Sequence, residues 1–236
     1  MTVDQKNELM RLDVVGVKDE TPMIRSFELA APGGNELPSF TAGAHIIVHL
    51  PGGYERQYSL SGDPADARRY RLGVLKLENG RGGSAAFHRE IELGDSLSVS
   101  APRNHFGLDE AAEHFRFIAG GIGITPFMSM VPVLKREGRA FHLDICTRTR
   151  AETPFLDELD RLVEQGVARF HHDGGNPDNG LQVEESLREV DLSCHVYCCG
   201  PMGLMKAVRK TSRHWPRDNI HFELFGSTQP AAKTGT

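Results

Sequence analysis

The sequence predicts two domains: a six-stranded antiparallel β-barrel followed by an α/β Rossmann-like domain with a parallel sheet. Three observations predict this fold class. The chain has 236 residues, which suits two modest domains. Short segments separated by Gly, Pro and Asp turns fill its first half. From about residue 115, strand-like and helix-like segments alternate instead, and the change of rhythm near residues 106–113 marks the expected boundary.

The first half is expected to form the barrel, which we place at residues 1–108. Its extended segments are short, close together and alternate between apolar and polar side chains, as in small antiparallel barrels. One helical piece, Ser84–Glu90, interrupts them. The predicted strands are Leu12–Lys18, Met23–Ala30, His45–Leu50, Tyr54–Ser61, Tyr70–Leu77 and Ser96–Ala101.

The second half is expected to form the α/β domain, at residues 112–226, with helices on both faces of a parallel sheet. The predicted strands are residues 115–120, 141–147, 167–172, 195–200 and 219–225. The predicted helices are Thr125–Glu137, Pro154–Glu164, Val183–Glu189 and Met202–Arg213. Residues 227–236 are small and polar with one proline, a composition that indicates a linker.

Composition and charge exclude several function classes. Hydrophobic residues make up 39% and charged residues 25%, as in ordinary globular proteins. The net charge is −5, and the chain lacks a Lys/Arg run, so nucleic acid and anionic membranes are not expected partners. The start of the chain has no signal-peptide pattern and no stretch approaches roughly 18 apolar residues. We therefore expect a cytoplasmic protein.

A glycine-rich turn between a strand and a helix is the strongest local signal. Gly120, Gly121 and Gly123 allow a tight turn and close approach of a phosphate to the first amides of the helix. Thr125 is predicted as the N-cap and Pro126 as part of the first turn. The alternative is a turn that binds no ligand, since the G-x-G-x-x-G pattern is not matched.

A second turn follows the predicted strand that contains Cys198 and Cys199 and ends at Gly200. A helix begins at or just after Pro201, with Met202 in its first turn. Open α/β sheets bind ligands at this carboxyl end of their strands. We predict that Cys199 projects into the crevice there. The alternative is a small buried apolar residue.

Two motifs in the barrel half offer groups for a phosphate and a ring. Arg56 can bind a phosphate, Tyr58 offers a ring face and Ser59 offers a hydroxyl. The second motif is a turn that leads into a helix and provides another anion site; it consists of Arg81, Gly82, Gly83 and Ser84. The alternatives are an exposed Arg beside a packed Tyr, and a hairpin without a ligand.

Together these motifs resemble the ferredoxin–NADP reductase superfamily, in particular its phthalate dioxygenase reductase type, over about residues 10–227. The matching patterns are R-x-Y-S at Arg56–Ser59, G-R-G-G-S around Arg81–Ser84, G-G-I-G-I-T-P at Gly120–Pro126, C-G-P at Cys199–Pro201 and H-F-E-x-F at His221–Phe225. That type includes the reductase components of Rieske oxygenases and aromatic O-demethylases. The order of these motifs makes the resemblance specific.

The resemblance implies a flavin in the barrel, FMN rather than FAD. By analogy Arg56 binds the flavin phosphate, together with the turn formed by Arg81, Gly82, Gly83 and Ser84. Tyr58 and Ser59 would contact the flavin ring. Phe225 would cover the ring until nicotinamide displaces it; alternatively, Phe225 is a core residue at a strand end.

The resemblance also implies a nicotinamide coenzyme in the α/β domain. Gly120, Gly121, Gly123 and Thr125 would line its cleft, and Cys199, with Gly200, Pro201 and Met202 beside it, would place nicotinamide C4 against flavin N5. Arg148 would stack on adenine or pair with a phosphate. NADH is expected rather than NADPH, although Arg148 and Arg150 supply two cations near the expected 2′-phosphate position.

The family implies a route for electrons from NADH through FMN to a [2Fe–2S] centre and on to a terminal Rieske-type oxygenase. Its members usually continue into a [2Fe–2S] ferredoxin domain, whose C-x4-C-x2-C spacing is absent from these 236 residues. We expect the parent reading frame to continue; the alternative is a separate ferredoxin. The four cysteines form no C-x2-C pair, so no structural metal site is expected.

Three other functions share parts of this pattern. A free-standing flavin reductase or a ferredoxin reductase would have the same fold. A non-enzymatic redox sensor would bind nucleotide without rapid turnover. Hydrolase motifs such as G-x-S-x-G, H-E-x-x-H and the P-loop are absent.

Overall fold

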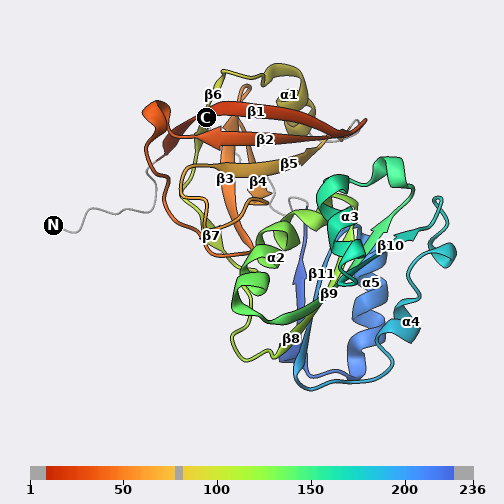
Figure 1. The fold of residues 1–236 in the computed structure, drawn as a ribbon. Coiled ribbons are helices and arrows are strands. Elements are labelled where there is room, and N and C mark those ends of the chain that lie inside the picture. Colours follow the sequence, from red (N-terminus) through yellow and green to blue (C-terminus); the bar gives the residue numbers. More distant parts are fainter. Residues whose placement is uncertain (1–8, 78–81, 226–236) are drawn as a thin grey trace, which may run out of the picture.

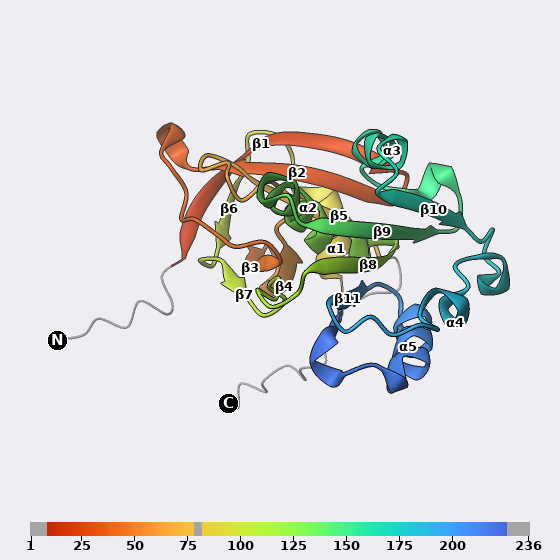
Figure 2. The same cartoon turned by 60° about the horizontal axis from the view of Figure 1, so that its bottom comes forward.

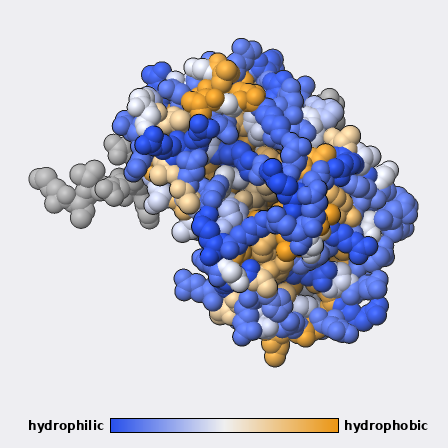
Figure 3. Space-filling view, in the orientation of Figure 1, coloured by the Kyte–Doolittle hydropathy of each residue, from blue (hydrophilic) through white to orange (hydrophobic). Residues whose placement is uncertain are grey.

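The computed structural model describes residues 9–77 and 82–225, which form a β-barrel and an α/β domain side by side (Figure 1). Arg81 of the predicted phosphate turn therefore lies outside the described residues, as does the predicted linker. Figure 3 shows this face of the molecule as largely hydrophilic, with hydrophobic groups visible over the barrel and between the two halves.

The barrel is an antiparallel sheet whose strands run in the order β4-β3-β6-β1-β2-β5. A bridge between Leu60 and Leu72 joins the end of β4 to β5 and so links the two edges of this path. The strands are β1 Met10–Thr21, β2 Ile24–Ala30, β3 Ala44–Leu50, β4 Tyr54–Ser59, β5 Tyr70–Leu75 and β6 Ser96–Val99. The six predicted strands are confirmed; a two-residue strand, β7 Arg103–Asn104, pairs with β3 in addition.

The barrel core comes from alternate residues of these strands and from helix α1, Gly83–Glu90. Phe87 of α1 is fully buried and its ring centroid lies 4.6 Å from that of Phe27. The ring of Tyr58 in β4 packs at right angles to the ring of Phe87, with centroids 5.3 Å apart. The helix therefore closes one end of the barrel and fixes the strand that carries Arg56 and Tyr58.

The second sheet is parallel and runs in the order β10-β9-β8-β11-β12. Its strands are β8 His114–Gly120, β9 Ala140–Thr147, β10 Ala168–His172, β11 Cys194–Cys199 and β12 Ile220–Glu223. Its helices are α2 Thr125–Glu137, α3 Leu156–Glu164, α4 Val183–Ser186 and α5 Met202–Thr211. The short 3-10 turns are η2 Pro32–Gly34, η3 Gly121–Ile124, η4 Arg150–Glu152, η5 Pro177–Asn179, η6 Ser212–His214 and η7 Arg217–Asn219.

Helices cover both faces of the parallel sheet, as predicted (Figure 2). Along β11, Tyr197 and Cys199 belong to the core shared with α2 and α3, whereas Val196 and Cys198 belong to the core shared with α4 and α5. This alternation follows from the two-residue period of a strand buried on both sides.

The predicted N-cap of α2 is wrong, and the predicted helix bounds differ from the structure at the starts of α1 and α3 and at the ends of α4 and α5, where α5 ends at Thr211 rather than Arg213. Helix α3 begins at Leu156 rather than Pro154 because Phe155 has a φ of 56°, in the left-handed region. Thr125 is not the N-cap of α2, since the turn Gly121–Ile124 runs directly into the helix and makes Thr125 its first residue. Helix α4 ends at Ser186 and not at Glu189. The prediction of Pro126 in the first turn of α2 is confirmed.

Polar contacts join the barrel to the α/β domain. The guanidinium of Arg71 in β5 donates to both carboxylate oxygens of Glu158 in α3, at 2.5 and 3.1 Å. The amide of Gly43 donates to Ser129 Oγ in α2 at 3.0 Å. The predicted domain bounds fall in the segment between β7 and β8 and stay a prediction. None of the helices within the described ranges has the length and apolar character that a membrane crossing requires.

Candidate active site

The carboxyl ends of three parallel strands meet the end of a barrel strand. Cys199 of β11 pairs with Ala119 of β8 on one side and with Glu223 of β12 on the other, so the three strands end at one edge of the sheet. Ser59, the last residue of β4, donates from Oγ to Oε2 of Glu223 at 3.2 Å. The candidate site therefore lies at the junction of the two domains.

Glu223 is a candidate site residue that was not singled out from the sequence. Burial raises the pKa of Glu223 to about 7, and the hydrogen bond from Ser59 partly offsets that effect. Ser59 is 4% exposed and Glu223 is half-buried, so the pair is partly shielded from water. The available signal was a carboxylate within the apolar ending H-F-E-x-F.

Cys199 does not project into an open crevice. Its side chain is 0% exposed and packs in the core with Tyr197 and Ile124. Burial, with a smaller contribution from Glu223, raises the pKa of the Cys199 thiol well above its ordinary value. The thiol is therefore neutral and forms an apolar wall beside the Glu223 carboxylate.

Three of the predicted glycines let two loops touch. A Cβ on Gly123 would lie 2.3 Å from the Cys199 carbonyl oxygen, and a Cβ on Gly120 would lie 2.4 Å from Cδ of Pro201. A Cβ on Gly200, whose φ is +157°, would lie 2.7 Å from Cα of Gly120. These glycines are needed for the contact of the loop after β8 with the loop after β11.

Gly121 and Thr125 occupy different surroundings. Gly121 has a φ of 53°, and nothing lies within 4 Å of the position where its Cβ would stand. Its backbone thus borders open space at the edge of the sheet. Thr125 is 2% exposed, donates to the carbonyl of Ile122 at 3.0 Å, and would be 2.7 Å from a Cβ on Gly73 of the barrel. Thr125 therefore packs at the domain junction.

The barrel side of the site brings Arg56 next to the start of α1. A Cβ on Gly83 would lie 2.5 Å from Nε of Arg56, so this guanidinium lies directly against the first residue of α1. Gly82 precedes the helix with a φ of 80°. The positive guanidinium and the first amides of an eight-residue helix thus lie together, and both attract an anion. Ser84 Oγ accepts a hydrogen bond from the amide of Leu77 at 3.1 Å.

Tyr58 carries a buried hydroxyl that has no hydrogen-bond partner within residues 9–77 and 82–225. Burial raises the pKa of Tyr58, so the hydroxyl stays protonated. A buried polar atom without a partner costs free energy, roughly 1–3 kcal/mol. A polar ligand group bound beside Arg56 and Tyr58 would satisfy it, so these residues fit a phosphorylated ligand with further hydroxyl groups.

The remaining predicted residues follow the ends of parallel strands and are exposed. Met202 is 53% exposed and Phe225 is 39% exposed. Pro201 is exposed as well. Arg148 is exposed at the end of β9. Arg150 is engaged elsewhere, with Nη2 2.6 Å from Asp160 and the guanidinium 5.5 Å from the Phe170 ring centroid.

Comparison with known proteins agrees with this geometry. Residues 117–210 match the oxidoreductase NAD-binding domain family. Phthalate dioxygenase reductase of Burkholderia cepacia is 41% identical over 237 residues, covering 100% of this chain and 74% of that protein. The phthalate 4,5-dioxygenase oxygenase reductase subunit of Pseudomonas putida is 44% identical over 219 residues, covering 92% of this chain and 68% of that protein.

A solved structure of phthalate dioxygenase reductase has the same fold. It is described as a modular structure for electron transfer from pyridine nucleotides to [2Fe–2S]. The TM-score is 0.90 at 41% identity, and the match covers 98% of this chain and 72% of that chain. About a quarter of that relative therefore lies outside the matched span.

Proposed function

The chain belongs to the phthalate dioxygenase reductase family of oxidoreductases, and we propose on that basis that it carries electrons from NADH through FMN to a [2Fe–2S] centre. The observation that carries the proposal is the contact between Ser59 and Glu223, 3.2 Å across the domain junction. It puts polar groups of the barrel and of the α/β sheet at one point, where two cofactors held by the two domains would meet.

The barrel would hold the flavin. Arg56 and the N-terminus of α1 would bind its phosphate, and the Tyr58 hydroxyl would hydrogen-bond its polar chain. One cluster of a guanidinium and a helix N-terminus suits the single phosphate of FMN. The flavin, when bound, accepts a hydride and releases electrons singly, which is chemistry that the side chains themselves lack.

The α/β edge would hold the nicotinamide coenzyme. The open backbone at Gly121 offers the approach for its phosphates, and Gly200, Pro201 and Met202 border the same edge. Buried Cys199 would form an apolar wall that excludes water beside the ring. Ser59 and Glu223 would position the polar edge of the ring, and Phe225 would cover the flavin face when the coenzyme is absent.

The surroundings of Arg148 support NADH over NADPH. A 2′-phosphate needs two or more cations, but the guanidinium of Arg150 is already paired with Asp160 and lies over the Phe170 ring. Arg148 would instead contact adenine or a phosphate. The ratio of the KM values for the two coenzymes tests this: a lower KM for NADH is expected, and an equal or lower KM for NADPH would overturn it.

The acceptor of the electrons follows from the relatives. Their names describe reductase components of dioxygenases and monooxygenases. We therefore propose that the [2Fe–2S] centre lies in a ferredoxin domain or a separate protein, and that a terminal Rieske-type oxygenase receives the electrons.

The experiment is the visible spectrum of the purified protein, with the mass of the cofactor released on boiling and the rate of NADH-dependent ferricyanide reduction. The proposal expects a yellow protein that releases FMN and reduces ferricyanide rapidly. Loss of FMN during gel filtration would favour a free-standing flavin reductase. Bound nucleotide without ferricyanide reduction would favour a redox sensor, and release of FAD would overturn the assignment of FMN.

A further inference from the structure

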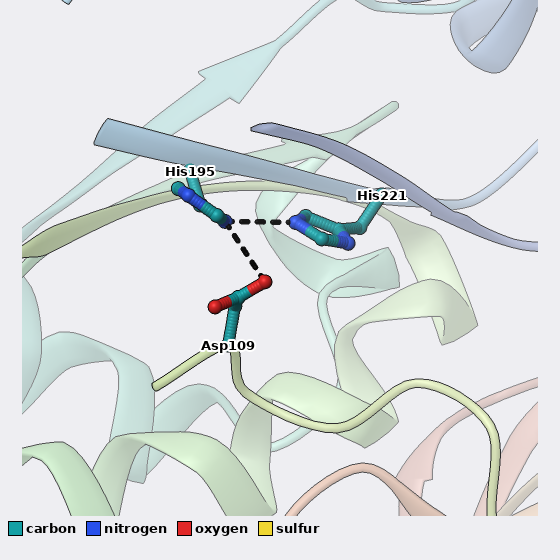
Figure 4. A group of neighbouring side chains, drawn as sticks. All are labelled: Asp109, His195 and His221. Carbon is teal, nitrogen blue, oxygen red and sulfur yellow. Dashed lines mark hydrogen bonds and ion pairs between the residues drawn. The ribbon is translucent and has the colours of Figure 1, made fainter. Parts of the chain in front are cut away.

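Three side chains that can bind metal ions meet beside the segment between the two domains (Figure 4). Asp109 lies in the segment that connects β7 to β8, His195 is the second residue of β11, and His221 is the second residue of β12. One ligand atom from each lies within 4.8 Å of the other two. The sequence predicts no metal site, because its cysteines form no C-x2-C pair. This cluster contains no cysteine, so cysteine spacing could not reveal it.

The separations of the ligand atoms suit a first-row metal ion. Nδ1 of His195 lies 3.0 Å from Nε2 of His221 and 3.7 Å from Oδ2 of Asp109. Ligands about 2.0–2.2 Å from a tetrahedral zinc ion are separated by roughly 3.3–3.5 Å. The two observed separations lie on either side of that range, so small side-chain rotations would bring all three atoms into coordination.

The carboxylate of Asp109 is held in place by neighbouring groups. Its Oδ1 accepts a hydrogen bond from the amide of Ala111 at 2.8 Å, and its own amide donates to the Tyr197 hydroxyl at 2.8 Å. Its carbonyl accepts from Nη2 of Arg139 at 3.0 Å. These contacts fix the residue and leave Oδ2 as the oxygen that faces His195. Such outer contacts orient the ligands of metal centres.

The two imidazoles are also held in place by their surroundings. The ring of His221 stacks on Tyr197, with centroids 4.1 Å apart and planes at 18°. The side chain of His195 is 8% exposed, whereas that of Asp109 is 37% exposed. The cluster therefore has one buried imidazole, His195, one half-buried imidazole, His221, and a carboxylate that reaches solvent, which provides an entry path and room for a water ligand.

We propose that Asp109, His195 and His221 form a binding site for a transition-metal dication, with Zn²⁺ as the ion that the ligand set suits. Two imidazoles and one carboxylate are typical zinc ligands, whereas Mg²⁺ and Ca²⁺ prefer oxygen. Each ring binds the ion through an unprotonated nitrogen and keeps its proton on the other. Water completes the fourth position.

A bound ion would join the segment between the domains to the strand that enters the candidate active site. His221 lies two residues before Glu223 in β12, a distance of roughly 7 Å along a strand. The ion would hold Asp109 against β11 and β12 at the base of the domain junction. The proposal does not depend on flavin or NADH binding.

The test is calorimetric titration of ZnCl₂ into the full chain after treatment with a chelator. One Zn²⁺ per chain and a rise of Tm with added Zn²⁺ are expected. Asp109→Asn keeps the Oδ1 acceptor for Ala111 but removes the negative charge, and His221→Gln removes one imidazole. Each substitution is expected to weaken zinc binding at least about tenfold and to abolish most of the rise in Tm.

His114→Gln is the matched control, because His114 forms a similar pair with Asp191 at 3.0 Å but belongs to no group of three possible metal ligands within residues 9–77 and 82–225. It should bind Zn²⁺ as the wild type does. The proposal is overturned by the absence of stoichiometric binding to the wild type, by unchanged binding in Asp109→Asn, or by equal weakening in His114→Gln. If His221→Gln does not fold, Asp109→Asn alone decides. Neither calorimetry nor Tm requires cofactor turnover, so a failure here is distinct from a failure of the proposed reductase activity.

Discussion

Two carboxylates lie within the same parallel sheet, and their partners differ. Asp144, in the middle of β9, is 2% exposed. Its Oδ2 accepts from Nη2 of Arg116 at 3.0 Å, and its Oδ1 lies 2.8 Å from Nε2 of His171. Burial would raise the pKa of Asp144, but hydrogen bonds from His142 and His171 and the charge of Arg116 hold it well below the ordinary value.

Glu223, at the edge of that sheet, has far fewer partners. The hydrogen bond that Glu223 accepts comes from a neutral donor, Ser59, and burial raises the pKa of Glu223 to about 7. A buried carboxylate with charged partners keeps its charge at little cost, whereas one beside a neutral donor at the junction of two domains is a candidate for a functional group. The comparison contrasts a structural acid, Asp144, with the acid that we propose for the active site, Glu223.

The largest effect is expected for Asp144→Asn. The substitution removes the charge that Arg116 pairs with, so the free energy of unfolding should fall by about 3–5 kcal/mol. Urea denaturation measures it, with the exposed Asp157→Asn as a control that should change little. A fall no larger than that of the control would show that Asp144 has no special structural role.

Arg56→Ala should weaken FMN binding at least about a hundredfold, because the phosphate would lose a charged, forked donor. The ratio of flavin to protein absorbance after gel filtration reports it. Arg69→Ala is the control, since Arg69 is an exposed barrel arginine paired with Glu28. Retention of FMN by Arg56→Ala at the wild-type ratio would remove Arg56 from the phosphate site.

Glu223→Gln should leave the free energy of unfolding nearly unchanged, in contrast to Asp144→Asn. It should slow reduction of the flavin by NADH about thirtyfold, which corresponds to about 2 kcal/mol for a lost charged hydrogen-bonding partner. Stopped-flow absorbance measures the rate, and urea denaturation measures the stability. A loss of stability like that of Asp144→Asn with an unchanged rate would reverse the assignment of roles.

Cys199→Ala should slow flavin reduction at least about tenfold while FMN stays bound, since the wall beside the nicotinamide would lose a side chain. Cys198→Ala is a matched control: Cys198 is equally buried but belongs to the core on the opposite face of the sheet. Equal rates for the two variants would assign Cys199 to packing alone.

The smallest effect concerns acid stability. Because the folded-state pKa of Asp144 lies below its ordinary value of 3.8, its stabilisation is complete above that pH and is lost as the pH falls further. Below about pH 4 the wild type should lose stability with an additional slope of up to about 1.4 kcal/mol per pH unit compared with Asp144→Asn. Parallel pH profiles of the two proteins would contradict this.

Much of the fold follows from local patterns in the sequence. Alternating short strands predicted the barrel, and the change to strand–helix repeats predicted the parallel sheet. The errors arose where backbone geometry decided the outcome: Phe155 in the left-handed region delayed α3, and the 3-10 turn before Thr125 displaced the N-cap. Neither feature has a sequence signature that distinguishes it from an ordinary helix start.

The site was less predictable because its contacts join distant parts of the chain. Ser59 and Glu223 are 164 positions apart, and only folding brings them together. Gly120, Gly123 and Gly200 were recognisable as glycine turns, but their contact with one another was not. The pairing of His195 with His221 depends on the register of β11 and β12, which no motif encodes.

The most direct test of the central claim is anaerobic addition of NADH to the purified, flavin-containing protein while the visible flavin absorbance is followed. One equivalent of NADH should bleach the flavin, and Glu223→Gln should do so more slowly with the same amplitude. A folded protein that takes up neither FMN nor FAD, or a bound flavin that NADH does not bleach, would contradict the claim that the two domains bring the cofactors together at Ser59 and Glu223.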